Sequence, residues 1–238
     1  MRGVPRFVRD AISYTRKTSS QEFGIHWSNL YPILHERRDA AGTASGGYFH
    51  QDLWAARKIF LRHPNSHVDI GSRIDGFIAH VLAFMPVTVI DIRAVQSRIH
   101  GLTFIQDDAT QLQTFSDNSV DSLSSLHAAE HFGLGRYSDP IDPDACFRFM
   151  GSLERVLCQG GRLYFSVPIG CERVDFNAHR VFATSTILKA FPKLSLVSFS
   201  IVDDAGELRE DATEEDTLSL EYGCGLFEFT KLPPVHHD

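Results

Sequence analysis

Histidine, acidic and glycine residues gather in a few short motifs, and their side chains can hydrogen bond to hydroxyl groups and move protons. The motif DIGSRIDG occupies residues 69–76, and single acids follow at Asp91 and Asp108. Further along, HAAEH occupies residues 127–131 and FNAHR occupies residues 176–180. Carboxylates accept hydrogen bonds, and histidine or glutamate can act as a general base. Hydroxyl binding and proton transfer are therefore the chemistry to expect from these motifs.

HAAEH also matches the HxxEH pattern of inverted zinc metalloproteases. That chemistry needs both histidines on one turn of helix and a third, distant ligand. Here the motif follows VDSLSSL, which alternates like a strand, and Gly133 and Gly135 make a continuing helix costly. We therefore expect a loop without a metal. In such a loop His131 can act as a base, or it can be a polar side chain that ties the loop together.

The elements that must hold these motifs follow from the pattern of apolar residues. Short apolar runs alternate with helical patterns, which indicates βα units and a largely parallel sheet. Two further strands flank an acidic loop near the end of the chain, with no helical pattern between them, so they should pair as an antiparallel hairpin. The predicted strands are 67–71, 87–92, 102–106, 120–126, 161–168, 194–202 and 222–230.

Two helices are marked in the sequence. Residues 51–61 carry apolar side chains at near-helical spacing, which predicts an amphipathic helix. A second helix precedes the fifth strand: Asp142 can cap it, Pro143 suits its first turn, and Gly160 with Gly161 can end it.

Strand order and motif spacing together resemble the class I S-adenosylmethionine-dependent methyltransferase superfamily, over about residues 50–231. The stretch LERVLCQGGRLYFSVP at 153–168 and the stretch FSDNSVDSLSSLHAAEH at 115–131 resemble two of its motifs, and Asp91 lies twenty residues past Gly71, as one helix and one strand require. The resemblance implies a Rossmann-like α/β fold, with a mostly parallel seven-stranded sheet, an antiparallel terminal hairpin and helices on both faces.

The same resemblance implies that S-adenosylmethionine is the cofactor. A carboxylate at the end of a strand can hydrogen bond to both ribose hydroxyls, which assigns that role to Asp91. The residues that the resemblance assigns to cofactor binding are Asp69, Gly71, Arg73, Gly76, Asp91, Asp108 and Leu126. The resemblance places four residues near the departing methyl group or the acceptor, as candidate catalytic residues: His127, Glu130, His131 and His179.

More narrowly, five phrases resemble a methyltransferase-like group, domain of unknown function 268. They are YFHQDLWAARKI, VDIGSRIDGFIAH, HFGLGRYSDPIDP, SVPIG and FNAHRVF. Members of this group are associated with the synthesis of bacterial surface polysaccharides, which implies a sugar or polysaccharide precursor as acceptor. The insert GLGRYSDPID after HAAEH is expected to cover the acceptor pocket.

Several roles stay open at this point. Arg73 stands where the superfamily has its middle glycine, and it can pair with the methionine carboxylate, form a structural salt bridge, or mark a loop that no longer binds the cofactor. Asp69 can anchor its turn through backbone amides, Asp91 can cap a helix, and Asp107 can replace Asp108. The alternative to a methyltransferase is a degenerate domain that binds a sugar or a partner protein without catalysis.

Composition limits the remaining function classes. The formal charge of −7 argues against a broad nucleic-acid surface, although residues 1–38 are locally basic and offer either a solvated face or a contact to an anionic partner. Four separated cysteines without a CxxC pair, and no apolar leader, favour the cytoplasm. The most apolar stretch, 77–90, falls short of the ~20 residues of a membrane span. We expect an N-terminal extension over 1–49 and a single domain over 50–238, and the oligomeric state stays open.

Overall fold

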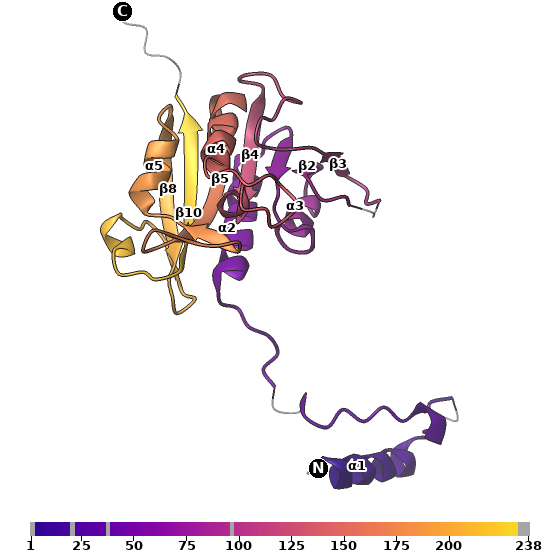
Figure 1. Cartoon of the computed structure of the whole chain (residues 1–238). Helices are drawn as coiled ribbons and strands as arrows, with labels where there is room; N and C mark the ends of the chain where they lie inside the picture. The colour runs from indigo at the N-terminus through magenta and orange to yellow at the C-terminus, as the bar shows by residue number, and fades with distance from the viewer. Residues whose placement is uncertain (1–2, 20–21, 37–38, 96–97, 233–238) are drawn as a thin grey trace, which may run out of the picture. The chain divides into compact units, whose positions relative to one another are not determined.

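The computed structural model describes residues 3–19, 22–36, 39–95 and 98–232 (Figure 1). Two units make up the chain, 1–43 and 44–238. The first contains the helix α1 (Val4–Lys17) and the short 3-10 helix η1 (Trp27–Asn29). The second contains all of the β-strands described below. That the first part is an extension of an independent domain stays a prediction.

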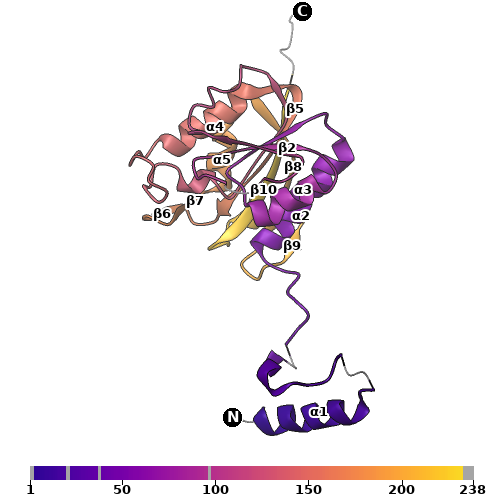
Figure 2. The same ribbon diagram turned by 90° about the vertical axis from the view of Figure 1, so that its right-hand side faces the viewer.

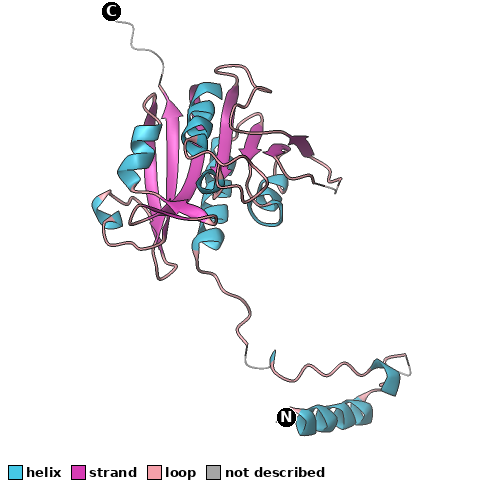
Figure 3. Ribbon diagram, viewed as in Figure 1, coloured by secondary structure: helices cyan, strands magenta, loops and turns pink. Residues whose placement is uncertain are grey.

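One sheet organises the second unit, and its strand order is β3-β2-β1-β4-β5-β10-β8-β9. Strands β1 to β5 run parallel to one another, whereas β10 is antiparallel to both β5 and β8. Figure 3 shows these strands as one layer between helices. The strands are β1 (His67–Ile70), β2 (Val87–Asp91), β3 (Leu102–Gln106), β4 (Val120–Leu126), β5 (Leu157–Ile169), β8 (Leu194–Val202), β9 (Leu208–Arg209) and β10 (Gly223–Lys231).

The predicted Rossmann-like class is confirmed, and so is the antiparallel pairing of the last two long strands. The short edge strand β9 extends the expected seven strands to eight. Parallel strands read as apolar runs because both faces of the sheet are covered. All four residues of β1 are buried, and β10 is buried at every position except Lys231.

Helices cover both faces of the sheet (Figure 2). On one face lie α2 (Gly47–Arg62), the π-helical turn η3 (Ile74–Ile78) and α3 (Ala79–Leu82), whose buried side chains include Trp54, Ile59 and Phe77. On the other lie α4 (Ala145–Val156) and α5 (Thr184–Ala190), which bury Phe149 and Ile187 among others. Each helix therefore contributes one apolar stripe to a core beside the sheet.

The ends of α4 differ from the prediction. Asp142 does not cap the helix: Asp144 holds the N-cap position, and the Asp142 carboxylate instead accepts a hydrogen bond from the Asp144 amide at 3.0 Å. The helix also ends earlier than Gly160, because β5 begins directly at Leu157. Gly160 lies inside this strand with φ of 74°, next to a register shift between β4 and β5.

A small antiparallel hairpin that the sequence pattern did not predict follows β5. It consists of β6 (Arg173–Asp175) and β7 (His179–Val181), and it carries the FNAHR motif. Among the residues that the structure describes, no helix is both long and apolar enough to cross a membrane.

Candidate active site

A cavity of about 550 Å³ opens where the parallel strands end. Residues that follow β1, β2, β3 and β4 line it, together with the insert after HAAEH and the β6–β7 hairpin. The strand order reverses between β1 and β4, and open α/β sheets bind ligands at such a switch point, beyond the carboxyl ends of the strands. The cavity therefore lies where the fold class places its ligand.

The turn after β1 is built on a buried carboxylate. Asp69 accepts hydrogen bonds from the Ser72 amide at 3.0 Å, the Ser72 hydroxyl at 2.6 Å and the Ser124 hydroxyl at 2.5 Å. Burial raises the pKa of Asp69 to about 6 against these hydrogen bonds. Gly71 lies at the cavity with φ of 74°, and a Cβ there would meet Ala128 at 2.9 Å. The turn needs glycine at this position because a side chain has neither the conformation nor the space.

Two residues assigned to cofactor binding do not reach this cavity. Asp69 is fully buried beneath the turn and acts by holding it, as its backbone-anchoring alternative anticipated. Gly76 lies in η3, where an added Cβ would meet the Asp52 carboxylate. Gly76 is absent from the cavity wall because the chain turns into η3 immediately after Arg73, and Asp69 is absent because its carboxylate is buried against Ser72 and Ser124.

Arg73 remains at the cavity wall while forming a salt bridge. Its guanidinium donates to Asp75 at 2.9 Å and lies over the Tyr48 ring, 5.3 Å from the ring centroid. The side chain is 57% exposed, so this salt bridge is a weak restraint. Arg73 is therefore free to exchange Asp75 for an anionic ligand group at little cost.

Asp91 ends β2 and is held by its neighbour. Oδ1 accepts hydrogen bonds from the Arg93 amide at 2.8 Å and from Nε at 2.9 Å, and Oδ2 accepts from Nη2 at 2.5 Å. A carboxylate offers about four lone-pair sites, so roughly one is left for a ligand hydroxyl. The Arg93 guanidinium also lies 4.8 Å from the centroid of the Tyr137 ring.

The two acids after β3 have different tasks. Asp107 uses both oxygens within its own loop, accepting from the Asp108 amide at 2.8 Å and the Thr114 hydroxyl at 2.9 Å. Asp108 accepts from the Thr110 amide through Oδ1 at 2.9 Å, and among the described residues nothing donates to its Oδ2. Both acids line the cavity, and Asp108 has the free oxygen.

The HAAEH motif leaves β4 as a turn. Leu126 ends the strand at the cavity, and His127 follows with φ of 50°. The imidazole of His127 lies beside the side chains of Gln51 and Ser166 and 5.3 Å from the Tyr48 ring. Burial lowers the pKa of His127 to about 3, so the ring is neutral.

Zinc chemistry of the HxxEH type does not fit this geometry. The 3-10 helix η4 (Ala129–His131) is three residues long and excludes His127, so the two histidines do not share a helix turn. The described part of the chain also contains no group of three histidine, cysteine or acidic side chains arranged for a metal ion.

Glu130 and His131 are neighbours in η4, where Glu130 is buried and His131 is partly buried. The Nε2 atom of His131 lies 3.6 Å from Glu130 Oε1, beyond hydrogen-bonding distance. His131 Nδ1 donates to the Ala178 carbonyl at 2.8 Å, which leaves a lone pair on Nε2 in the neutral ring. Burial lowers the pKa of His131 to about 4 and raises that of Glu130 to about 8. Glu130 Oε2 is buried, and no described residue hydrogen bonds to it.

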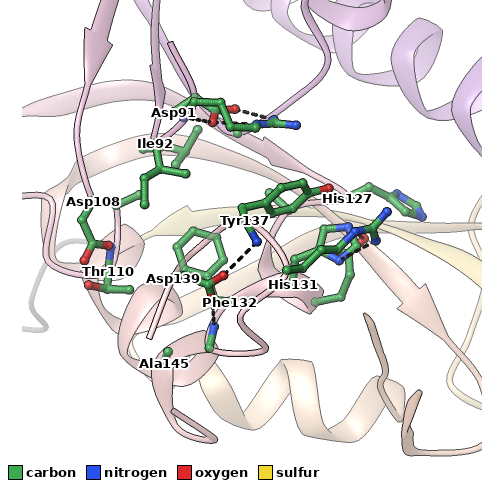
Figure 4. A pocket seen from close by; sticks show the side chains of 18 of the residues that line it. Asp91, Ile92, Asp108, Thr110, His127, His131, Phe132, Tyr137, Asp139 and Ala145 are labelled. Atoms are coloured by element: carbon green, nitrogen blue, oxygen red, sulfur yellow. Dashed lines mark hydrogen bonds and ion pairs between the residues drawn. The ribbon is translucent and has the colours of Figure 1, made fainter. Parts of the chain in front are cut away.

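The insert from Gly133 to Asp142 forms one wall of the cavity. The Asp139 carboxylate accepts from the Gly133 amide at 2.7 Å and from the Tyr137 amide at 3.1 Å. The Tyr137 ring lies 5.7 Å from the His131 ring. In Figure 4, Asp108 and His127 lie on opposite sides of the cavity, with Tyr137 between them. Tyr137 thus contacts residues of both halves of the site.

The β6–β7 hairpin and Tyr222, which lies just before β10, close the remaining side. His179 lies 3.3 Å from Asp175 without a hydrogen bond, and its ring is 5.0 Å from that of Tyr222. Burial raises the pKa of Tyr222 to about 12. The motif reasoning did not single out several polar cavity residues, among them Tyr48, Arg93, Arg136 and Tyr222. Only Arg93 had a local signal, as a cation two residues after an acid that ends a strand.

Comparison with known proteins agrees with this architecture. The family described as "Caenorhabditis protein of unknown function, DUF268" matches residues 77–213, more than half of the chain. No curated protein matches the sequence. The N-methyltransferase NodS from Bradyrhizobium japonicum WM9, in complex with S-adenosyl-L-homocysteine, has a similar structure: TM-score 0.54 at 14% identity, covering 78% of this chain and 88% of that one.

Two further solved structures are similar. A Burkholderia thailandensis 1,6-didemethyltoxoflavin-N1-methyltransferase aligns with TM-score 0.53 at 13% identity, over 77% of this chain and 79% of that one. The [4+2]-cyclase SpnF aligns with TM-score 0.55 at 13% identity, over 77% and 81%. The chain therefore has the class I methyltransferase fold. A cyclase among the neighbours means that the fold alone does not define the reaction.

Proposed function

This chain belongs to the family of unknown function DUF268, and we propose that it is an S-adenosylmethionine-dependent methyltransferase whose acceptor is a small hydroxylated molecule of the sugar class. One observation carries the proposal. A single cavity joins the strand-end acids Asp91 and Asp108 to His131 and to Glu130, whose Oε2 has no hydrogen-bond partner among the described residues. The first pair suits a nucleoside, and the second suits a hydroxyl that must lose its proton.

The residues on the first side fit the cofactor part by part. Asp91 would bind the ribose, Ile92 and Ala109 would flank the adenine, Asp108 would bind its polar edge, and Arg73 would pair with the methionine carboxylate. The cavity volume of about 550 Å³ is within the range of small-molecule sites, ~300–1,000 Å³. When bound, the cofactor supplies an electrophilic methyl group on its sulfonium.

On the second side, Glu130 and His131 both line the cavity; Glu130 Oε2 has no hydrogen-bond partner among the described residues, and neutral His131 keeps a lone pair on Nε2. A base works best when its pKa is near the working pH, which favours Glu130, at about 8, over His131, at about 4. We infer that the Glu130 carboxylate removes the hydroxyl proton and that His131 Nε2 orients the same hydroxyl.

The other two histidines would position the acceptor. His127 is held against Gln51 and Ser166, behind the Tyr48 ring, so it would support the wall. His179 and Tyr222 present a tilted ring pair with polar atoms at the cavity. Aromatic faces edged by polar groups suit a polyhydroxylated ring, which supports a sugar acceptor.

A specific observation favours the second candidate, a domain that keeps the fold and binds a different ligand without catalysis. Arg93 occupies most of the Asp91 carboxylate, and Arg73 stands where the superfamily has glycine. In this case the acids would serve the internal structure of the site.

Calorimetric titration with S-adenosylmethionine and S-adenosylhomocysteine separates the two candidates. If the protein is a methyltransferase, we expect micromolar dissociation constants for both ligands, which correspond to binding free energies of about −7 to −8 kcal/mol. The outcome that contradicts this proposal is the absence of any heat of binding with either ligand at millimolar concentration. If circular dichroism shows that the protein is folded, this result would exclude the cofactor and leave the second candidate.

A further inference from the structure

Helix α1 has two sharply different faces. Apolar side chains recur at Val4, Phe7, Val8, Ala11 and Ile12, the spacing that forms one continuous stripe on a helix. No residue of α1 is buried, and Val4, Val8 and Ile12 are each about half exposed. A helix whose apolar stripe is exposed has a surface that another apolar phase can cover.

The opposite face of α1 is basic. It carries Arg6, Arg9, Arg16 and Lys17 against the single acid Asp10, in a chain whose formal charge is −7. Arg6 and Arg9 share Asp10, at 3.8 and 3.3 Å. Within the described residues no carboxylate pairs with Arg16 or Lys17. This concentration of positive charge is unlike the rest of the molecule, and it complements an anionic surface.

Large aromatic side chains follow the helix within the same unit. Phe23, Trp27 and Tyr31 are 71%, 85% and 83% exposed. The Tyr14 hydroxyl donates to the Phe23 carbonyl at 3.1 Å, which ties this segment to α1. Aromatic rings with a polar edge are favoured at the boundary between lipid headgroups and acyl chains.

We propose that α1 binds to the surface of an anionic lipid membrane, lying in its plane. The apolar stripe enters the boundary of the acyl chains, and the basic side chains contact the headgroup phosphates. A protein groove would take the apolar stripe, but it would not call for four basic side chains and exposed aromatic rings together. The proposal does not depend on the methyltransferase activity.

The test is co-sedimentation of the full chain with lipid vesicles. Vesicles in which about a third of the lipid is phosphatidylglycerol should bind at least tenfold more protein than pure phosphatidylcholine vesicles, and added salt should weaken this binding. Equal binding to both kinds of vesicle, or binding to neither, would overturn the proposal.

Two variants with the same change of charge compare how much the apolar face and the polar face of α1 contribute to vesicle binding. Val8→Asp puts a carboxylate on the apolar stripe and should abolish sedimentation, whereas Ser13→Asp puts it on the polar face and should weaken sedimentation only a few-fold. An equal loss in both would mean that charge alone attracts the chain, and the proposed insertion would be wrong.

A protein partner is the competing outcome. Light scattering without vesicles would detect it: concentration-dependent self-association that Val8→Asp abolishes would assign the stripe to a second copy of the chain and overturn the lipid proposal. Neither substitution should change the thermal midpoint of the second unit, because α1 buries no residue.

Discussion

At the scale of single residues, arginine side chains of the site already pair with the carboxylates that lie beside them. Arg93 takes three of the roughly four acceptor positions of Asp91, and Arg73 is shared between Asp75 and the Tyr48 ring. Each arrangement satisfies a charged group with a partner from the chain itself. A cofactor must therefore replace these contacts as well as form its own.

The Asp91–Arg93 contact gives the first prediction. Asp91→Ala should weaken binding of S-adenosylhomocysteine by about 1.5–3 kcal/mol, the scale for hydrogen bonds to a charged group. Arg93→Gln should strengthen binding of S-adenosylhomocysteine a few-fold, because the guanidinium no longer competes with the ligand for the Asp91 carboxylate. The gain is small because a partly exposed ion pair contributes about 0–1 kcal/mol. Calorimetry measures both, with Glu210→Ala in the exposed acidic loop as control. Weaker binding in Arg93→Gln would mean that the arginine holds Asp91 ready for the ligand.

Arg73→Gly tests whether the arginine serves the cofactor. The variant should bind S-adenosylhomocysteine more weakly, and the loss of affinity with added salt should be smaller, because one charge contact to the methionine carboxylate is gone. The fold should be unchanged, since the Arg73 side chain is mostly exposed. Tighter binding would instead identify the arginine as an obstruction and point to another natural ligand.

Glu130 gives a prediction about rate and pH. Turnover of a sugar acceptor should rise with pH, with a midpoint near the Glu130 pKa of about 8, because only the carboxylate can take the proton. Glu130→Gln should lower turnover at least a hundredfold while cofactor binding stays within about tenfold. His131→Ala should lower turnover at unchanged midpoint, and Glu210→Gln should leave both unchanged. A midpoint that persists in Glu130→Gln would assign the base elsewhere.

At the scale of elements, the sequence was informative where apolar periodicity is strong. The long strands of the sheet and the helix α4 follow from their patterns. The strand-end acids Asp91 and Asp108 lie at the cavity, and their roles in cofactor binding stay predictions. The hairpin β6–β7 was not predictable because strands of three residues are too short for a visible period. Asp142 was predicted as the helix cap from its sequence position alone. In the structure its carboxylate contacts the Asp144 amide and Arg148 instead.

The residues missed in the site share a cause. Tyr48 lies in the first turn of α2, Arg136 in the insert, and Tyr222 just before β10, and the fold brings these distant segments together at one cavity. No local pattern marks such a convergence. Asp69 shows the reverse case, in which a residue of the expected motif supports the turn from below.

The insert from Gly133 to Asp142 gives a prediction at this scale. Asp139→Ala removes the acceptor for two backbone amides, so the insert should open more often. Amide hydrogen exchange should become faster over about residues 133–142 and stay unchanged in β4 and α4. Asp139→Asn keeps one acceptor oxygen and should give an intermediate rate. Unchanged exchange in Asp139→Ala would mean that the tight turns alone hold the insert.

At the scale of the whole molecule, buried titratable groups oppose one another. Burial lowers the pKa of His67 and His127 to about 3 and that of His131 to about 4, from 6.5. The unfolded chain therefore takes up protons below pH 6.5 that the folded chain refuses, and stability falls as the pH falls. Burial raises the pKa of Glu130 to about 8 from 4.5 and that of Asp69 to about 6 from 3.8. Those two acids hold their protons only in the folded state, so their contribution is lost as the pH rises.

The opposing pKa shifts of the buried histidines and acids predict how the stability of the protein depends on pH. Between pH 6.5 and about 8, Glu130 is the group among the described residues that sets the slope, and the free energy of unfolding should fall by about 1.4 kcal/mol per pH unit. Between about pH 4.5 and 6, the unfolded chain binds three more histidine protons than the folded chain, at His67, His127 and His131, and the folded chain binds two more acid protons, at Glu130 and Asp69. The free energy of unfolding should therefore rise with pH in this range, with a slope of about the same size as the alkaline one. Urea unfolding across this range should therefore give a maximum near pH 6 to 6.5. Glu130→Gln should remove the alkaline slope and about double the acidic one, because it deletes one of the two opposing acids. An alkaline slope that survives in this variant would contradict the buried, proton-holding Glu130 on which the proposed base also depends.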